Sequence, residues 1–137
     1  LAVEFFQMGD QLLVNEIAPR VHNSGHWTMQ GADTCQFENH IRAVRGLPLG
    51  STKVTSPTVM INIIGCKDFA RDMLSIEGCH LHWYGKAPRN KRKMGHFNLC
   101  GDNYQQLAKT MQTLAGYLPI EHFPLLIDEA KRLAEIK

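Results

Sequence analysis

The stretch Asn15-Glu16-Ile17-Ala18-Pro19-Arg20-Val21-His22-Asn23-Ser24-Gly25-His26-Trp27-Thr28 decides how the rest of this chain is interpreted. It places an acid, an arginine, two histidines, an asparagine and a serine close together. Pro19 and Gly25 interrupt the stretch, and because both residue types favour turns we expect a loop here. Polar loops on a rigid scaffold often carry function. A solvated surface loop is the alternative interpretation.

A β-hairpin is expected directly before this loop. Residues 2–8 and 12–17 have the pattern of two strands, and Met8-Gly9-Asp10-Gln11 supplies the turn. A turn centred on Asp10 places Glu4 directly opposite Glu16. Strand alternation then puts both acids on one face of the hairpin. The other side chains expected on that face are Phe6, Met8, Leu12 and Val14.

Facing carboxylates suggest a cation site. Like charges directly opposite each other destabilise a hairpin unless something neutralises them. Magnesium binds one or two carboxylates together with substrate phosphates, so Glu4 and Glu16 are candidate metal ligands. The alternative is that both acids simply point into solvent.

A helix is expected after the loop, from Asp33 or Thr34 to about Arg45, where Gly46 ends it. Its expected buried stripe consists of Phe37, Ile41 and Val44.

Beyond Leu47-Pro48-Leu49-Gly50-Ser51, which looks like a domain boundary, the patterns predict a small β unit and then two helices. The expected elements are a strand at 58–64, a short helix at 68–75, strands at 80–84 and 95–99, and helices at 104–115 and 123–136. The chain is therefore expected to have an α+β fold.

A basic loop joins the strands at 80–84 and 95–99, and it has three interpretations. Its cations are Lys86, Arg89, Lys91, Arg92 and Lys93. They can form a solvated tip, bind nucleic acid, or hold one phosphate of a small ligand. The loop lacks the interleaved aromatic residues that single-stranded nucleic acids stack on.

Composition bounds these interpretations. The 137 residues are 44% hydrophobic and 20% charged, as in ordinary globular proteins, with a net charge of +2 that by itself indicates neither nucleic acid nor membrane. No apolar run approaches the roughly 20 residues of a membrane span, and we see no signal peptide. The four cysteines lack the spacing of a zinc motif, so reduced thiols and a cytoplasmic location are expected.

Four segments resemble the 5-(carboxyamino)imidazole ribonucleotide synthetases, an ATP-grasp family of purine biosynthesis. The segments are residues 2–6, 15–28, 36–50, and 82–86 together with 92–96. They occur in the family's order, so the chain looks like the carboxy-terminal portion of such an enzyme. The resemblance implies the end of the ATP-grasp domain (1–50) and a small β-rich hybrid-motif-like domain (51–101). The helical patterns add a helical tail (102–137), and its stretch after about Gly116 is longer than the family leads us to expect.

The resemblance also implies a reaction. Enzymes of this family use ATP, Mg²⁺ and bicarbonate to make carboxyphosphate, and they transfer its carboxyl group to the amine of 5-aminoimidazole ribonucleotide. The implied partners are that substrate, the amino-terminal part of the same enzyme and a second copy in a homodimer, without nucleic acid or membrane. A non-catalytic binding or dimerisation module derived from the same enzyme is the alternative.

The resemblance assigns roles residue by residue. Glu4 and Glu16 match the metal ligands, with Asn15 beside Glu16 as a second contact to magnesium–nucleotide. Arg20 and His22 match the catalytic residues. The implied substrate contacts are Asn23, Ser24, Lys86, Arg89, Arg92 and Lys93, with Lys86 and Arg92 holding the 5′-phosphate. The family commonly has Pro-Gly where this sequence has Asn90-Lys91.

Overall fold

The structure is a computed structural model that describes residues 1–66 and 70–136, and it divides into two compact units, Leu1–Lys53 and Val54–Lys137. Both contain helices and strands, so the expected α+β class is confirmed. The division into 1–50, 51–101 and 102–137 stays a prediction.

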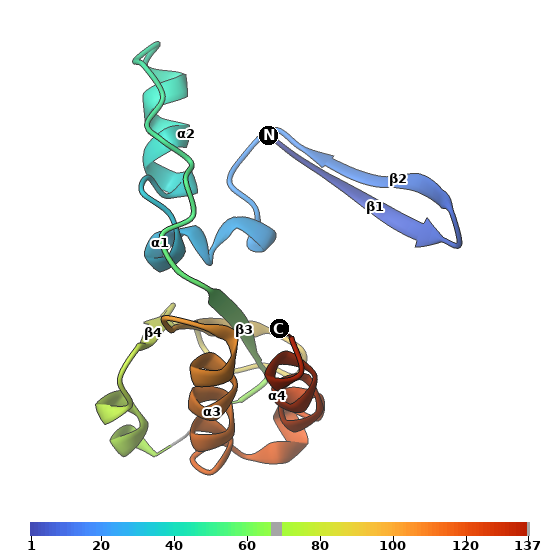
Figure 1. Ribbon diagram of the computed structural model, residues 1–137. Coiled ribbons are helices and arrows are strands. Elements are labelled where there is room, and N and C mark those ends of the chain that lie inside the picture. Colours follow the sequence, from blue (N-terminus) through green and yellow to red (C-terminus); the bar gives the residue numbers. More distant parts are fainter. Residues whose placement is uncertain (67–69, 137) are drawn as a thin grey trace. The chain divides into compact units, whose positions relative to one another are not determined.

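The first unit opens with the expected hairpin, formed by antiparallel strands β1 (Ala2–Met8) and β2 (Gln11–Ala18), as Figure 1 shows. Glu4 faces Glu16, which confirms the predicted pairing of the two acids. The turn between the strands has only two residues, and Gly9 has a φ of +61°. A positive φ at the first central position is what a type II′ hairpin turn requires.

The predicted register is wrong beyond the acids. The pairing shifts between Glu4 and Phe5, so that Phe5 faces Val14 and Phe6 faces Leu13. Because the turn is shorter than predicted, β2 has one extra residue, which the hairpin accommodates as a bulge. Leu12 and Val14 therefore lie on the face opposite Glu4, and only β1 follows the predicted alternation.

The rest of the first unit consists of a 3₁₀ turn at Asn23–Gly25, α1 (Thr28–Gly31) and α2 (Gln36–Val44). α2 begins later than predicted, with Cys35 rather than Asp33 or Thr34 at its N-cap. It ends as predicted, because Gly46 takes a φ of +65° directly after the helix.

The predicted burial of the α2 stripe is wrong. The exposed fraction is 37% for Phe37, 60% for Ile41 and 69% for Val44. Apolar spacing shows which side chains share a face of a helix, but it does not show whether the unit offers an element to cover that face.

The second unit contains a three-stranded antiparallel sheet in the order β3-β5-β4. Its strands are β3 (Thr58–Ile64), β4 (Cys79–Trp83) and β5 (Lys93–Cys100), which confirms the three expected strands and the expected pairing of β4 with β5. Of the short helix predicted at 68–75, residues 68–69 lie outside the described residues, and the remainder contains a 3₁₀ helix at Arg71–Ser75.

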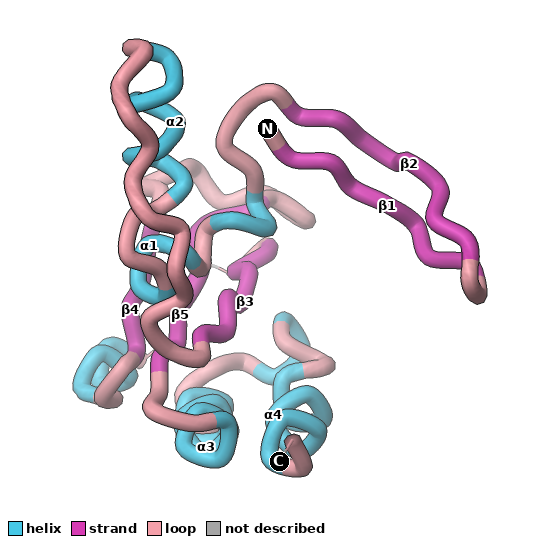
Figure 2. Tube along the Cα trace, turned by 45° about the horizontal axis from the view of Figure 1, so that its top comes forward, coloured by secondary structure: helices cyan, strands magenta, loops and turns pink. Residues whose placement is uncertain are grey.

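Two helices pack on one face of this sheet, α3 (Tyr104–Ala115) and α4 (Leu126–Ala134), and a 3₁₀ turn at Ile120–His122 lies between them in the chain. Figures 1 and 2 show the helices side by side. The buried residues that join helices and sheet in one core include Ile63, Phe97, Leu99, Leu107, Met111, Leu114, Leu126 and Ala130. Residues 104–136 therefore share the core of the sheet.

The other face of the sheet carries a row of polar side chains beside Met60 on β3. His96 on central strand β5 faces Asn62 on β3 and His82 on β4, and Asn98 on β5 faces His80 on β4. This row of amide and imidazole side chains follows from the alternation in β4 and β5.

Two further properties follow from the described residues. None of the four cysteines, all of which are described, forms a disulfide. No helix among residues 1–66 and 70–136 is long and apolar enough to cross a membrane.

Candidate functional site

The base of the hairpin brings together four of the predicted site residues. A carboxylate oxygen of Glu4 accepts a hydrogen bond of 3.0 Å from the Asn15 side-chain amide. A carboxylate oxygen of Glu16 lies 3.2 Å from Nη2 of Arg20, four residues along the chain. The other terminal nitrogen of Arg20 donates to the backbone carbonyl of Val21. Asn15 thus directs its N–H groups, rather than its oxygen, at Glu4.

His22 completes this group from the loop. Its side chain is nearly buried, and its Nε2 lies 3.1 Å from a carboxylate oxygen of Glu4. Its Nδ1 accepts a hydrogen bond from the Ser24 backbone N–H, and the Ser24 hydroxyl lies 2.9 Å from the same nitrogen. Because Nδ1 accepts, a neutral imidazole carries its proton on Nε2 and donates it to Glu4.

Gln36 holds the loop in place, although the sequence alone assigns it no role. Its side chain accepts from the backbone N–H of His22 (2.9 Å), donates to the His22 carbonyl (2.8 Å) and lies 2.6 Å from Nδ1 of His26. A Cβ at Gly25 would lie 2.6 Å from the Gln36 oxygen, so glycine at this position leaves room for the Gln36 side chain. No local pattern in the sequence indicates a contact over this separation.

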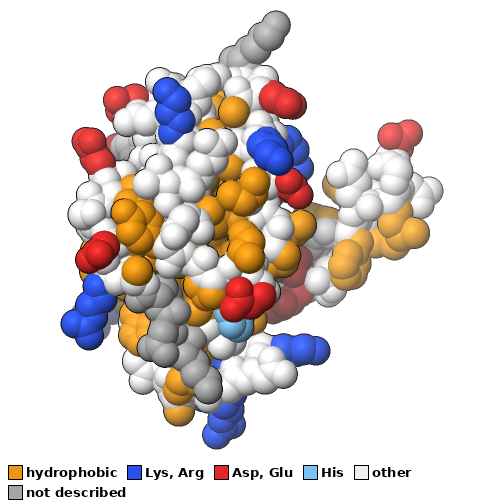
Figure 3. Space-filling model, turned by 90° about the horizontal axis from the view of Figure 1, so that it is seen from below, with side chains coloured by type: hydrophobic (Ala, Val, Ile, Leu, Met, Phe, Trp, Pro, Cys, Tyr) orange, Lys and Arg blue, Asp and Glu red, His pale blue; other side chains and the backbone are white. Residues whose placement is uncertain are grey.

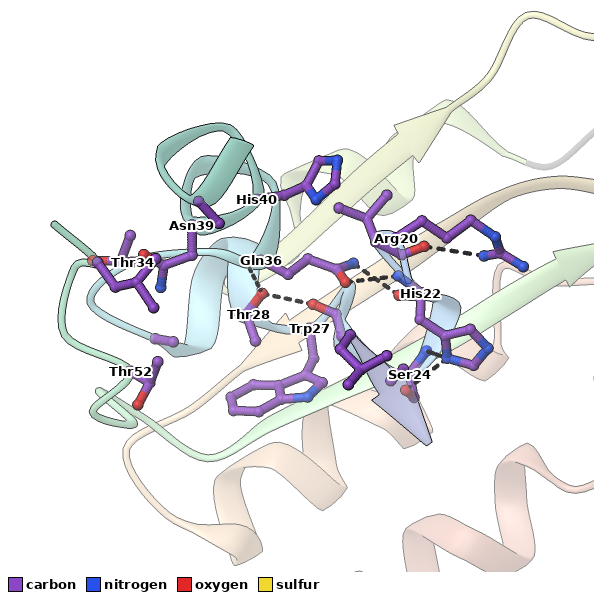
Figure 4. Close-up of a pocket in the computed structure, with 17 residues that line it drawn as sticks. Arg20, His22, Ser24, Trp27, Thr28, Thr34, Gln36, Asn39, His40 and Thr52 are labelled. Atoms are coloured by element: carbon purple, nitrogen blue, oxygen red, sulfur yellow. Dashed lines mark hydrogen bonds between the residues drawn. The ribbon is translucent and has the colours of Figure 1, made fainter. Parts of the chain in front are cut away.

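Next to these residues the first unit contains a cavity of about 540 Å³. Figure 4 shows Arg20, His22, Ser24 and Gln36 on one side of it, and His40 and Asn39, both from α2, on another. The cavity therefore has polar side chains from both the loop and α2. Among the predicted site residues, Asn23 begins the 3₁₀ turn within this loop.

Glu4, Glu16 and His22 form a donor set that fits a metal ion. Each offers one ligand atom, and these atoms lie within 4.8 Å of one another. Two hard carboxylate oxygens suit magnesium, which prefers oxygen ligands. In the structure Glu16 forms an ion pair with Arg20, and Glu4 accepts a hydrogen bond from His22.

In the second unit, the basic loop converges on one aromatic ring. Nζ of Lys86 lies 4.9 Å and Nζ of Lys93 lies 5.7 Å from the centre of the Tyr84 ring. Burial lowers the pKa of Lys93, and the nearby charge of Lys86 lowers it further. Of the predicted phosphate contacts, Lys86 and Lys93 are the two whose ammonium groups lie near the same aromatic ring.

The two arginines of the loop are placed differently. Nη1 of Arg92 donates to the backbone carbonyl of Ala87, and its backbone N–H donates to the carbonyl of Arg89. Arg92 therefore braces the loop internally, while the Arg89 side chain is exposed. Lys91 has a φ of +57° and is the only non-glycine residue with a positive φ among those described.

Tyr84 is held at both ends. Its backbone N–H donates to the Met94 carbonyl, and its hydroxyl lies 2.7 Å from Nδ1 of buried His96. His96 stacks on His82 with ring centres 4.5 Å apart. Burial lowers the pKa of His82, as does the neighbouring His80.

Comparison with known proteins gives matches to both units. The ATP-grasp domain model matches residues 1–37, and the model described as phosphoribosylaminoimidazole carboxylase C-terminal domain matches residues 58–110. The first match contains the hairpin acids and the polar loop, and the second contains the sheet and the basic loop.

Relatives match almost the whole chain. The chain is 58% identical over 132 residues to N5-carboxyaminoimidazole ribonucleotide synthase of Vibrio vulnificus, covering 96% of this chain but 35% of that protein. Among solved structures, the synthetase of Thermus thermophilus is 54% identical with a TM-score of 0.77, covering 85% of this chain and 32% of that one. The enzyme of Aspergillus clavatus, in complex with ADP and 5-aminoimidazole ribonucleotide, is 34% identical with a TM-score of 0.71, covering 95% and 34%.

The chain thus spans about a third of the length of these relatives. Both domain matches and the similar structures agree on one family. The chain therefore belongs to the N5-carboxyaminoimidazole ribonucleotide synthase family and corresponds to its carboxy-terminal portion.

Proposed function

We propose that this chain provides the metal, bicarbonate and ribonucleotide contacts of a ligase that uses ATP to carboxylate the amine of 5-aminoimidazole ribonucleotide. The observation that carries the proposal is the group formed by Glu4, Glu16 and His22, whose ligand atoms lie within 4.8 Å. Arg20 lies beside it, paired with Glu16. The group lies in the part of the chain that matches the ATP-grasp domain.

In this proposal Glu4 and Glu16 hold magnesium. The hairpin register places the two carboxylates face to face, and Asn15 fixes the orientation of Glu4 through its amide. When bound, magnesium would neutralise the negative charge of the phosphates during phosphoryl transfer.

Arg20 and His22 bind the anionic part of the reaction. The planar guanidinium of Arg20 matches a carboxylate or phosphate, and carboxyphosphate carries both groups. His22 carries its proton on Nε2 in the arrangement described above, so it is a donor on the side that faces the carboxylates. Asn23 and Ser24 extend this donor surface along the 3₁₀ turn.

The basic loop holds the 5′-phosphate of the ribonucleotide. Its cations lie at the end of the polar face of the sheet, and the set comprises Lys86, Arg89, Arg92 and Lys93. Charge-assisted bonds to phosphate are shorter and stronger than neutral ones, so a few of these groups are sufficient for recognition. The relative from Aspergillus clavatus was solved with this ribonucleotide bound.

The complete ligase requires more than these residues. The matched relatives are about three times as long as this chain, so we propose that adenine and the ATP phosphates are held by an amino-terminal part of the enzyme. We also propose that the enzyme is a homodimer and that it acts in the cytoplasm, where ATP and bicarbonate are available.

A chimera tests this function. The 132 matched residues of the Vibrio vulnificus enzyme would be replaced by the corresponding residues of this chain. We expect ADP release that requires both bicarbonate and 5-aminoimidazole ribonucleotide, with formation of the carboxylated product. The unmodified Vibrio enzyme is the positive control.

A folded chimera that binds ATP but releases no ADP would contradict the proposal. It would favour the alternative, a non-catalytic module derived from the same enzyme. That the chimera is folded can be checked by circular dichroism and by thermal unfolding.

A further inference from the structure

We propose that Tyr84 is a positioning residue whose ring holds the ammonium groups of Lys86 and Lys93 together as a binding site for a phosphomonoester. The identity of that phosphomonoester, the ribonucleotide substrate, rests on the proposed function. The paired site itself rests on the distances of 4.9 and 5.7 Å from the two Nζ atoms to the ring centre.

The ring is suited to this role because it is fixed before any ligand arrives. Its backbone N–H donates to the Met94 carbonyl, which continues the pairing of β4 with β5. Its hydroxyl is hydrogen-bonded to His96, which is only 2% exposed. The His96 ring contacts the Tyr84 ring edge-on, with centres 5.7 Å apart, and stacks on His82. The aromatic face is therefore presented by a rigid part of the sheet.

The two lysines come from opposite ends of the basic loop. Lys86 follows Tyr84 after Gly85, whose φ of +62° turns the chain. Lys93 begins β5, on the other side of the basic loop. A cation within about 6 Å of an aromatic centre is attracted to the negative face of the ring. One ring thus restrains two flexible side chains from the two ends of the loop.

Two neighbouring ammonium groups repel each other, and a bound anion offsets this repulsion. The pKa of Lys93 is lowered mainly by burial, and the nearby charge of Lys86 lowers it further, as expected for two neighbouring cations. Among the described residues, no carboxylate forms an ion pair with Lys86. A dianionic phosphate carries enough negative charge to attract both ammonium groups at once.

The first experiment detects the arrangement directly in the full 137-residue chain. Reductive methylation with ¹³C-formaldehyde converts lysines to dimethyl-lysines, which keep their positive charge and give resolved NMR signals. We expect ring-current shifts at Lys86 and Lys93 that are absent at exposed Lys109 and Lys131. Lys→Arg variants assign the signals. Unshifted signals at Lys86 and Lys93 would overturn the proposal without any change to Tyr84.

The second experiment measures binding of ribose 5-phosphate to the same chain. Replacing Tyr84→Leu removes the ring and should weaken binding about tenfold, the combined effect of two cation–π contacts. Tyr84→Phe keeps the ring and should weaken binding by no more than about threefold, which separates the ring from the hydroxyl. Tyr104→Leu on α3 is the matched control and should bind normally. Equal binding by Tyr84→Leu and wild type would contradict the role.

The third experiment separates this inference from the proposed function. In the chimera, Tyr84→Leu should raise KM for 5-aminoimidazole ribonucleotide about tenfold, with KM for ATP unchanged. An inactive chimera together with Tyr84-dependent binding of ribose 5-phosphate would reject only the ligase function. An active chimera with unchanged KM in Tyr84→Leu would reject only the positioning role.

Discussion

Lys91 has a backbone conformation that suits glycine. Its φ of +57° lies in the left-handed region, which costs an ordinary residue about 1–2 kcal/mol. The resemblance implies glycine at this position, and this chain has lysine instead. The loop thus adopts a turn that favours glycine with a lysine in that place.

Replacing Lys91→Gly should therefore stabilise the chain. The relief of strain exceeds the entropic cost of glycine, so we expect a gain of about 0.5–1 kcal/mol in the free energy of unfolding. Urea unfolding measures it. Lys91→Ala removes the same charge without relieving the strain and is the control. An equal gain in both variants would show that charge, not backbone strain, is responsible.

Cys79 gives a prediction about pH. Burial raises the pKa of its thiol to about 11. Only the thiolate is nucleophilic, so alkylation at Cys79 should rise about tenfold per pH unit without a plateau below about pH 10. Peptide mass spectrometry after timed treatment with iodoacetamide measures this.

The same shift affects stability. A thiol in the unfolded chain ionises near about pH 8.5. The contribution of Cys79 to stability is therefore full below that pH and is lost as the pH rises towards about 11. Cys79→Val should reduce this alkaline loss of stability. A plateau in alkylation near about pH 8.5 would instead mean that the thiol is exposed in the native state.

At the scale of elements, the hairpin shows what sequence patterns can and cannot predict. The pairing of Glu4 with Glu16 was predictable because alternation and an approximate turn position are sufficient for it. The bulge was not, because it depends on whether the turn takes two residues or three. The contact between Gln36 and His22 was also unpredictable, since it joins α2 to the backbone of a loop through side-chain hydrogen bonds.

The sheet was more predictable than the helix of the first unit. In β4 and β5, alternation correctly separates the apolar side chains that pack against α3 and α4 from the polar side chains of the other face, although β5 itself is buried on both faces. In α2 the apolar stripe was assigned to a core, but the structure leaves Ile41 and Val44 exposed. Periodicity describes the element, whereas burial depends on its partners.

The hairpin acids give the prediction for this scale. Glu4→Gln or Glu16→Gln keeps the shape of the side chain and removes its charge, so the folded chimera should lose ADP release by about a hundredfold or more. Glu38→Gln is the control, because Glu38 is an exposed acid on α2 that pairs only with Arg42 among the described ion pairs. Full turnover in both hairpin variants would remove them from the metal site.

At the scale of the whole molecule, the hairpin is unusual for its exposed apolar surface. Figure 3 shows hydrophobic side chains along the extended arm at the right. The exposed apolar residues of the two strands are Val3, Phe5, Phe6, Met8, Leu12, Leu13, Val14 and Ile17. They occupy both faces, and a two-stranded hairpin by itself is only marginally stable in water. Such a surface favours association with another polypeptide.

The isolated chain should therefore self-associate through its hairpin and should not catalyse ligation. Reacting groups must be held within about 3–3.5 Å, which requires contacts on both sides of the nucleotide. The ATP-grasp match in this chain extends over residues 1–37.

Light scattering after size exclusion should show concentration-dependent oligomers, and Phe5→Thr combined with Leu12→Thr should reduce them. Ile120→Thr with Leu125→Thr changes exposed apolar residues of the second unit and should have no effect. Adding the amino-terminal part of the Vibrio enzyme should compete with self-association and should give ADP release. Ligation by the chain alone would contradict the prediction, because it would show that 137 residues are sufficient for a complete active site.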